Sequence, residues 1–258
     1  MKPKFKTELY NDHFQNFKRY GIPKAQLIIA DIPYNLGNNA YASNPSWYKD
    51  GDNANGESDK AGKEFFDIDK DFRIAEYMHF CSQMMRPEPK ETGKAPCMII
   101  FCAFKQIPMI IEYGIKHGFK RNIPLFFIKN YSAQVLKANM RIVGATEHAI
   151  VLYRDKLPKF NNDRKMIYNW FTWFKDTNTP KIHPTQKPIN VLKNLIQIYT
   201  DPGDVVIDPV AGSGTTLRAC AELNRNCYGF EIKKDFYKKA KDVMLKNIQG
   251  NLFCGGKE

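Results

Sequence analysis

Short apolar runs alternate with stretches of helical periodicity along this chain, and that alternation predicts βα units around a mainly parallel sheet. Runs of mostly branched and aromatic residues predict buried strands at residues 27–30, 97–104, 123–128, 149–153, 205–207 and 227–232. Apolar positions three and four residues apart predict helices at residues 74–85, 107–115, 189–199, 215–223 and 236–244. Pro108 falls in the first turn of its helix, where the missing N–H is tolerated. The pattern thus predicts one α/β fold.

Three stretches break this rhythm. Residues 35–63 are polar and rich in glycine and asparagine, residues 131–146 are basic, and residues 155–182 combine basic side chains with tryptophan and phenylalanine. Long connections in compact domains are usually functional or disordered. We interpret residues 1–248 as a single domain with an insertion loop at 35–63, and residues 249–258 as a flexible tail.

The net charge of the chain indicates the class of its binding partner. The 258 residues carry a formal net charge of +12, with a pI near 9.3. A basic protein of this kind binds polyanions, although a solvated basic surface is the alternative. No apolar run approaches the ~18 residues that cross a bilayer, and the N-terminus lacks the apolar segment of a signal peptide. We therefore expect a cytoplasmic protein without membrane contact.

The six cysteines include no CxxC pair. Cys97 and Cys102 have no histidine at the spacing of a metal site. We interpret the cysteines as reduced core residues and expect no metal.

The late part of the chain contains an acidic residue and a glycine turn directly after the strand predicted at 205–207. Residues 208–216 read DPVAGSGTT, in which Gly212 and Gly214 permit a tight turn and a close approach of ligand to backbone. A phosphate-binding P-loop is disfavoured because no lysine follows the glycines, and a dinucleotide fingerprint because Leu217 replaces its third glycine. Glu231 follows the next strand, where a carboxylate accepts hydrogen bonds from ribose hydroxyls.

The early part of the chain contains a second acidic strand end. Asp31, Ile32, Pro33 and Tyr34 (DIPY) follow the strand predicted at 27–30. Pro33 holds Ile32 extended and directs its carbonyl outward. The Asp31 carboxylate and that carbonyl are two acceptors beside the aromatic ring of Tyr34, which suits a planar ring with an amino group. A plain strand-terminating turn is the alternative.

Taken together and in this order, the two strings resemble the β-group amino DNA methyltransferases, whose D-P-P-Y catalytic motif precedes the cofactor motif. Residues 183–188, HPTQKP, match a third motif of that family. The match is most similar to phage- and prophage-type adenine methylases. The resemblance implies a Rossmann-like methyltransferase fold with one antiparallel strand, S-adenosylmethionine as cofactor, and Asp31, Ile32, Pro33 and Tyr34 as the catalytic residues. Two positions depart from the family pattern: Ile32 replaces proline, and Val210 replaces phenylalanine.

The same resemblance implies which residues hold the cofactor. The cofactor-binding residues are expected to be Asp208, Pro209, Ala211, Gly212, Ser213, Gly214, Thr215 and Glu231, together with His183, Thr185, Gln186, Lys187 and Pro188. The implied chemistry moves a methyl group to an exocyclic amine that Asp31 and the Ile32 carbonyl hold by its hydrogens. An initial aspartate in the catalytic motif usually accompanies adenine in this family, so we expect the N6 amine of adenine.

The expected partner is DNA, and residues 155–182 are the candidate target-recognition segment because the family places that function there. The proposed DNA contacts are Trp47, Lys129, Lys137, Arg141, Arg164 and Lys165. A homodimer and a cognate restriction endonuclease are further expected partners. The alternatives are a methyltransferase for the N4 amine of cytosine, for RNA or for a protein amide, a non-catalytic DNA-binding module, and a nicotinamide oxidoreductase, which the imperfect glycine pattern disfavours.

Overall fold

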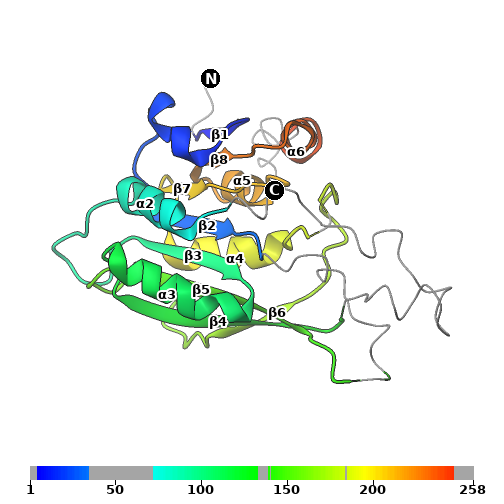
Figure 1. Cartoon of the computed structure of the whole chain (residues 1–258), viewed down its shortest axis with the longest axis horizontal. Helices are drawn as coiled ribbons and strands as arrows, with labels where there is room; N and C mark the ends of the chain where they lie inside the picture. The colour runs from blue at the N-terminus through cyan, green and yellow to red at the C-terminus, as the bar shows by residue number, and fades with distance from the viewer. Residues whose placement is uncertain (1–4, 35–71, 133–138, 140, 184, 247–258) are drawn as a thin grey trace, which may run out of the picture.

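The computed structural model describes residues 5–34, 72–132, 139, 141–183 and 185–246. Within these residues eight strands form one twisted sheet, in the order β1-β8-β7-β2-β3-β5-β4-β6 (Figure 1). The strands are β1 (Thr7–Tyr10), β2 (Leu27–Asp31), β3 (Cys97–Cys102), β4 (Arg121–Lys129), β5 (Thr146–Tyr153), β6 (Trp170–Trp173), β7 (Val205–Asp208) and β8 (Asn226–Phe230). β5 runs antiparallel to β3 and β4, and the other pairs are parallel. The mostly parallel α/β fold with one antiparallel strand is thus confirmed.

Helices cover both faces of the sheet. The α-helices are α2 (Ile74–Met84), α3 (Ile107–Lys116), α4 (Ile189–Tyr199), α5 (Thr215–Glu222) and α6 (Lys234–Lys239). Shorter turns form η1 (Phe14–Arg19), η5 (Phe104–Gln106) and the π-type turn η7 (Ala240–Met244). Side chains of η1, α2 and α3 pack in one core cluster, and those of α4, α5 and η7 pack in the other (Figure 1).

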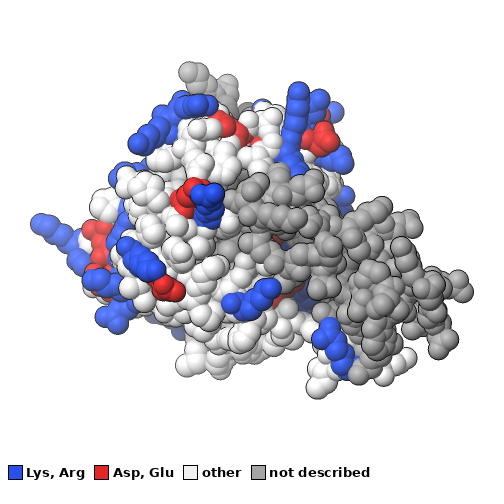
Figure 2. All heavy atoms as spheres, in the orientation of Figure 1, with Lys and Arg blue, Asp and Glu red and all other residues white. Residues whose placement is uncertain are grey.

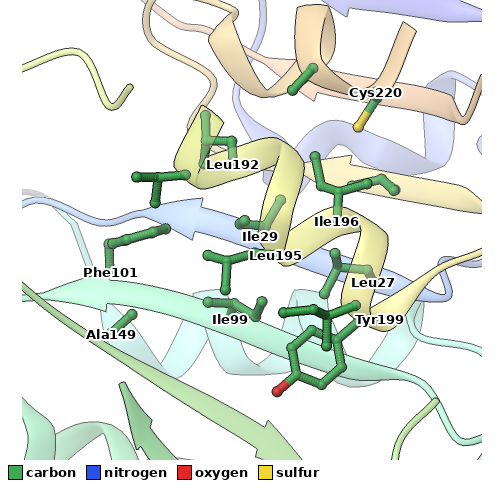
Figure 3. Close-up of a cluster of buried hydrophobic side chains, with 14 of the residues drawn as sticks. Leu27, Ile29, Ile99, Phe101, Ala149, Leu192, Leu195, Ile196, Tyr199 and Cys220 are labelled. Atoms are coloured by element: carbon green, nitrogen blue, oxygen red, sulfur yellow. The ribbon is translucent and has the colours of Figure 1, made fainter. Parts of the chain in front are cut away.

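Helix α4 shows how the apolar pattern builds one of these cores. Its buried side chains include Leu192, Leu195, Ile196 and Tyr199, which recur three and four residues apart and so share one face. Figure 3 shows these side chains directed onto strands β2, β3 and β5. Each fully buried leucine or isoleucine contributes about 1.5–3 kcal/mol from apolar burial, so this one face anchors the helix to the centre of the sheet. Pro188 caps the helix, which places Lys187 immediately before its first turn.

Most predicted boundaries agree with the structure, and the exceptions have local causes. The strand predicted at 97–104 ends at Cys102, because the Gln106 side chain accepts a hydrogen bond from the Ala103 N–H at 2.9 Å and starts η5. The strand predicted at 227–232 ends at Phe230. The helix predicted at 236–244 divides into α6 and η7.

The prediction missed the two edge strands. β1 and β6 are four residues long and each has a single neighbouring strand. Edge strands are often short, and four residues are too few to show the alternation that a sequence reading detects. β6 lies inside residues 155–182, so this segment contributes to the sheet as well as to the connections around it.

The cysteines among the described residues are buried and unpaired: Cys81, Cys97, Cys102, Cys220 and Cys227. Burial raises the pKa of the Cys102 thiol to about 12, so it stays protonated at neutral pH. Their packing role is therefore the one that the sequence predicted. Among the described helices, none has the length and apolar character required to traverse a bilayer.

Gly229 offers a test of the packing beneath the late glycine turn. A Cβ at this position in β8 would lie 2.7 Å from Leu217 Cδ1 and 3.1 Å from Ala211 Cβ. Replacing Gly229 with valine is expected to lower the free energy of unfolding by about 1–3 kcal/mol, because the buried neighbours must shift. Urea unfolding measures this change. Gly144→Val is the control, since nothing lies within 4 Å of a Cβ there; equal losses in both variants would contradict the packing argument.

Candidate active site

The two acidic strand ends lie at the same edge of the sheet. β2 and β7 are parallel neighbours, with Leu27 opposite Val206 and Ile28 opposite Ile207. Asp31 and Asp208 are the last residues of these two strands. Ligands of open α/β sheets bind at the carboxyl ends of the strands. The fold therefore brings the early and late strings, far apart in sequence, to one place.

The late string forms a tight turn beside the hexad at 183–188. Gly212 and Gly214 have φ angles of 51° and 73°, in the left-handed region that favours glycine. The Gly214 N–H donates to the Ala211 carbonyl at 2.8 Å and closes the turn. The nearest atom to a Cβ built on Gly212 belongs to His183, at 3.9 Å. A side chain at this position would therefore reach van der Waals contact with the ring of His183, the first residue of the hexad.

Two buried carboxylates hold this turn. Glu231 Oε2 accepts a hydrogen bond from the Gly212 N–H at 2.9 Å, and its Oε1 accepts one from the Lys233 N–H at 2.7 Å. Burial raises the pKa of Glu231, while these backbone donors act in the opposite direction. Burial also raises the pKa of Asp208 to about 7, although the Val210 N–H donates to its Oδ1 at 3.1 Å. Adjacent buried carboxylates favour a cationic ligand, because a positive charge stabilises their ionised forms.

The early string forms a corner around Asp31. Its Oδ2 accepts a hydrogen bond from Lys187 Nζ at 2.6 Å, and the Lys187 side chain is only 8% exposed. Asp31 Oδ1 is buried and has no hydrogen-bond partner among the described residues. Burial raises the pKa of Asp31, and the Lys187 ammonium opposes that rise. A buried acceptor without a donor costs stability, so Oδ1 is suited to a donor from a ligand at this edge of the sheet.

The rest of the corner is fixed by hydrogen bonds from other strands. The Ile32 N–H donates to the Phe101 carbonyl at 3.2 Å, and the Gln106 side chain donates to the Pro33 carbonyl at 3.0 Å. The Tyr34 hydroxyl donates to Glu147 Oε2 at 2.9 Å. The backbones of Ile32 and Pro33 are therefore held by β3 and η5, and the Tyr34 side chain by β5.

Residues of the hexad at 183–188 contact different parts of the protein. Lys187 contacts Asp31, whereas the Gln186 side chain binds its own loop, accepting from the Ile182 N–H at 3.2 Å and donating to the Pro180 carbonyl at 2.9 Å. Thr185 Oγ1 lies 3.1 Å from His183 Nδ1. Burial, with help from Lys187 and Lys233, lowers the pKa of His183 to about 4, so its ring is neutral at physiological pH.

A comparison of sequences identifies the family. The profile of the DNA methylase family, which covers N6 and N4 methyltransferases, matches residues 25–242 and so includes both strings and the hexad. The chain belongs to this family.

Individual relatives agree with that membership. DNA adenine methyltransferase YhdJ of Escherichia coli K12 is 26% identical over 261 residues, a match that covers 90% of this chain and 80% of YhdJ. Type II methyltransferase M.HindIII of Haemophilus influenzae is 49% identical over 55 residues, which cover 21% of this chain and 18% of M.HindIII.

Solved structures share the fold of this DNA methylase. M1.HpyAVI in complex with SAM is 25% identical, with a TM-score of 0.65 over 91% of this chain and 97% of the other. The cytosine-N4-specific PvuII DNA methyltransferase is 12% identical, with a TM-score of 0.66 over 98% of this chain and 96% of the other. At 12% identity the second likeness concerns the fold alone.

Among the described residues, the proposed DNA contacts of this DNA methylase lie in two separate segments of the chain, 129–141 and 164–165. Lys129 lies beside the corner around Asp31, where its ammonium pairs with Glu147. Arg164 and Lys165 follow Asn161, whose N–H donates to the Ile198 carbonyl at 2.7 Å, near the end of α4 that is distant from Lys187. Arg141 is exposed, while Trp47 and Lys137 lie outside the described residues. Figure 2 shows basic side chains scattered across the face formed by α2 and α3 as well as along its margin.

Two residues near Asp31 carry contacts that the sequence reading did not assign. Glu147, in β5, binds Tyr34 and Lys129. Trp173, at the end of β6, is buried, its ring centroid lies 5.8 Å from Lys187 Nζ, and its Nε1 has no partner among the described residues. In the sequence, Glu147 and His148 resemble the middle segment of the methyltransferase family without an assigned role, and Trp173 is an aromatic residue in an irregular segment. Neither indicates a site until the sheet order is known.

Proposed function

We propose that this DNA methylase transfers the methyl group of S-adenosylmethionine to the exocyclic N6 amine of adenine in DNA. The observation that carries the proposal is the buried, unpartnered Oδ1 of Asp31, next to Tyr34 and at the same sheet edge as the Gly212 turn. An acceptor in that state suits an N–H donor of a ligand. Asp31 as the first residue of the motif favours adenine over cytosine, as does the similarity to an enzyme named for adenine.

The residues at the sheet edge fit the proposed cofactor. S-adenosylmethionine would supply a methyl group on a positively charged sulfur, together with an ammonium group. Asp208, Glu231 and Asp31 provide carboxylates whose charge complements that cation. Gly212 takes a left-handed backbone conformation at this edge, and Glu231 directly follows β8, where a carboxylate accepts hydrogen bonds from a ribose.

The chain's own residues account for activation of the amine. The lone pair of the adenine amine is delocalised into the ring, which makes the nitrogen a poor nucleophile. Asp31 Oδ1 and the Ile32 carbonyl would each accept one of its hydrogens, which draws the nitrogen toward a tetrahedral shape. The Tyr34 ring would stack on the base and offset part of the few kcal/mol spent in removing it from the duplex. Orientation alone supplies up to roughly 7–11 kcal/mol.

Cofactor affinity should depend on pH through Asp208. Its pKa of about 7 in the free protein means that the carboxyl is largely protonated below pH 7. A bound cation favours the ionised form, so we expect affinity to fall up to about tenfold per pH unit below 7 and to level off above it. Calorimetry across this range, in buffers of different ionisation enthalpy, measures the affinity and the released proton. Asp208→Asn should abolish the pH dependence, and an unchanged profile in that variant would contradict the assignment.

The proposed reaction is tested by the product. DNA from cells that express the protein is digested to nucleosides and analysed by mass spectrometry for N6-methyladenine and N4-methylcytosine. N6-methyladenine absent from control cells is the expected result. N4-methylcytosine alone would overturn the choice of base, and the absence of both would overturn the proposed function.

The homodimer and the companion restriction endonuclease remain proposals. The similarity to M.HindIII, a type II methyltransferase, motivates the endonuclease. Because the net charge is +12, we propose that phosphate contacts dominate DNA affinity and make it fall steeply with salt.

A further inference from the structure

A continuous series of polar contacts extends from the catalytic corner into the antiparallel part of the sheet. The Tyr34 hydroxyl donates to Glu147 Oε2 at 2.9 Å, and Lys129 Nζ donates to Glu147 Oε1. On the other side, Lys187 Nζ lies 3.4 Å from the Tyr34 hydroxyl and 2.6 Å from Asp31 Oδ2. Cations and anions thus alternate on both sides of one phenol group.

The protonation states of Tyr34 and Glu147 determine which of them donates the hydrogen bond and which accepts it. Burial alone would raise the pKa of Glu147, but Lys187 and Lys129 outweigh it and hold that pKa below its ordinary value. Burial and the carboxylates of Asp31 and Glu147 raise the pKa of Tyr34 well above its ordinary value. The phenol therefore keeps its proton and is the donor in its hydrogen bond with the ionised Glu147.

The backbone of Glu147 is held in the strand ladder of the sheet, whereas the backbone of Tyr34 is not. It lies in β5, which pairs with both β3 and β4. Tyr34 lies three residues beyond the end of β2, outside the strand ladder. The side chains of Glu147 and Lys129 are 20% and 14% exposed, so the hydrogen bond forms in a poorly solvated place where it is strong.

We infer that Glu147 is a positioning residue: by holding the Tyr34 hydroxyl, it fixes the aromatic ring in the orientation in which it stacks on the target base. Glu147 itself does not touch the reacting atoms. This inference rests on the proposed function and extends it to a residue outside the three motifs.

The test combines Tyr34→Phe and Glu147→Ala as single and double variants of the full chain. Each single variant removes one side of the same hydrogen bond. We expect each to lower kcat for DNA methylation by about 10-fold to 100-fold, and to change the KM for S-adenosylmethionine by less than about threefold. The double variant should be no slower than the slower single variant, since both remove one contact.

Glu147→Gln separates positioning from charge. The amide keeps a polar contact with the Tyr34 hydroxyl but removes the negative charge, so this variant should retain more activity than Glu147→Ala. Glu222→Ala is the matched control, because Glu222 is a partly exposed carboxylate in α5 paired with Lys193 and Arg218. It should keep the wild-type kcat.

A second measurement does not depend on activity. The free energies of unfolding of the same variants should show that the effects of Tyr34→Phe and Glu147→Ala are not additive. Additive unfolding energies, multiplicative losses of kcat, full activity in Tyr34→Phe, or a Gln variant as slow as the Ala variant would each overturn the inference. An inactive wild type would instead refute the proposed function, while the unfolding cycle would still judge the contact.

Discussion

Replacing Asp31 with alanine is expected to lower the rate of methyl transfer by at least about 100-fold to 1,000-fold, while the Kd for S-adenosylmethionine stays within about threefold of wild type. The variant loses the buried Oδ1 that is proposed to accept the amine hydrogen. The Gly212 turn and its Glu231 partner are untouched, because they follow β7 and β8 rather than β2.

Quantification of N6-methyladenine and calorimetry with the cofactor measure the two effects on one preparation. Retained cofactor binding shows that the sheet is still folded. Asp201→Ala is the control: this carboxylate pairs with Lys159 before β7 begins, at the opposite end of the strand from Asp208. Methyl transfer at the wild-type rate in Asp31→Ala would refute the catalytic assignment.

Replacing Lys187 with methionine is expected to shift the acidic limb of the activity profile to higher pH. Burial raises the pKa of Asp31, and the ammonium 2.6 Å away is the main opposing influence. Without that cation the pKa of Asp31 rises further, so the ionised carboxylate is lost at a higher pH. The acidic limb therefore moves to higher pH. We expect activity at pH 7 to fall by about 10-fold to 100-fold and to recover as the pH increases.

Single-turnover rates measured from about pH 5.5 to about pH 9.5, in steps of about half a pH unit, would resolve this shift. Lys193→Met is the matched control, since Lys193 pairs with Glu222 on the α4–α5 side of the sheet and its loss should leave the profile unchanged. A Lys187→Met profile that is uniformly lower, without displacement along the pH axis, would contradict the role of Lys187 in keeping Asp31 ionised.

The identity of Lys187's partner illustrates what the sequence could not supply. The hexad indicated a cofactor pocket, yet Lys187 lies 156 positions from Asp31 in sequence and contacts it directly. Gln186, in the same hexad, turns back onto its own loop. Both residues share one short motif, and only the packing of α4 onto the sheet determines which of them faces the corner.

The sequence by itself determined the strand and helix pattern, the mainly parallel sheet and the positions of Asp31 and Asp208 at strand ends, because periodicity and turn chemistry are local properties. Tertiary structure alone decided that β5 lies beside β3, which places Glu147 on Tyr34 and Lys129. It also decided that the polar segment before α4 contains β6 and brings Trp173 to Lys187. Such pairings depend on sheet order and register, which are set by contacts between residues far apart in the chain and leave no local signal.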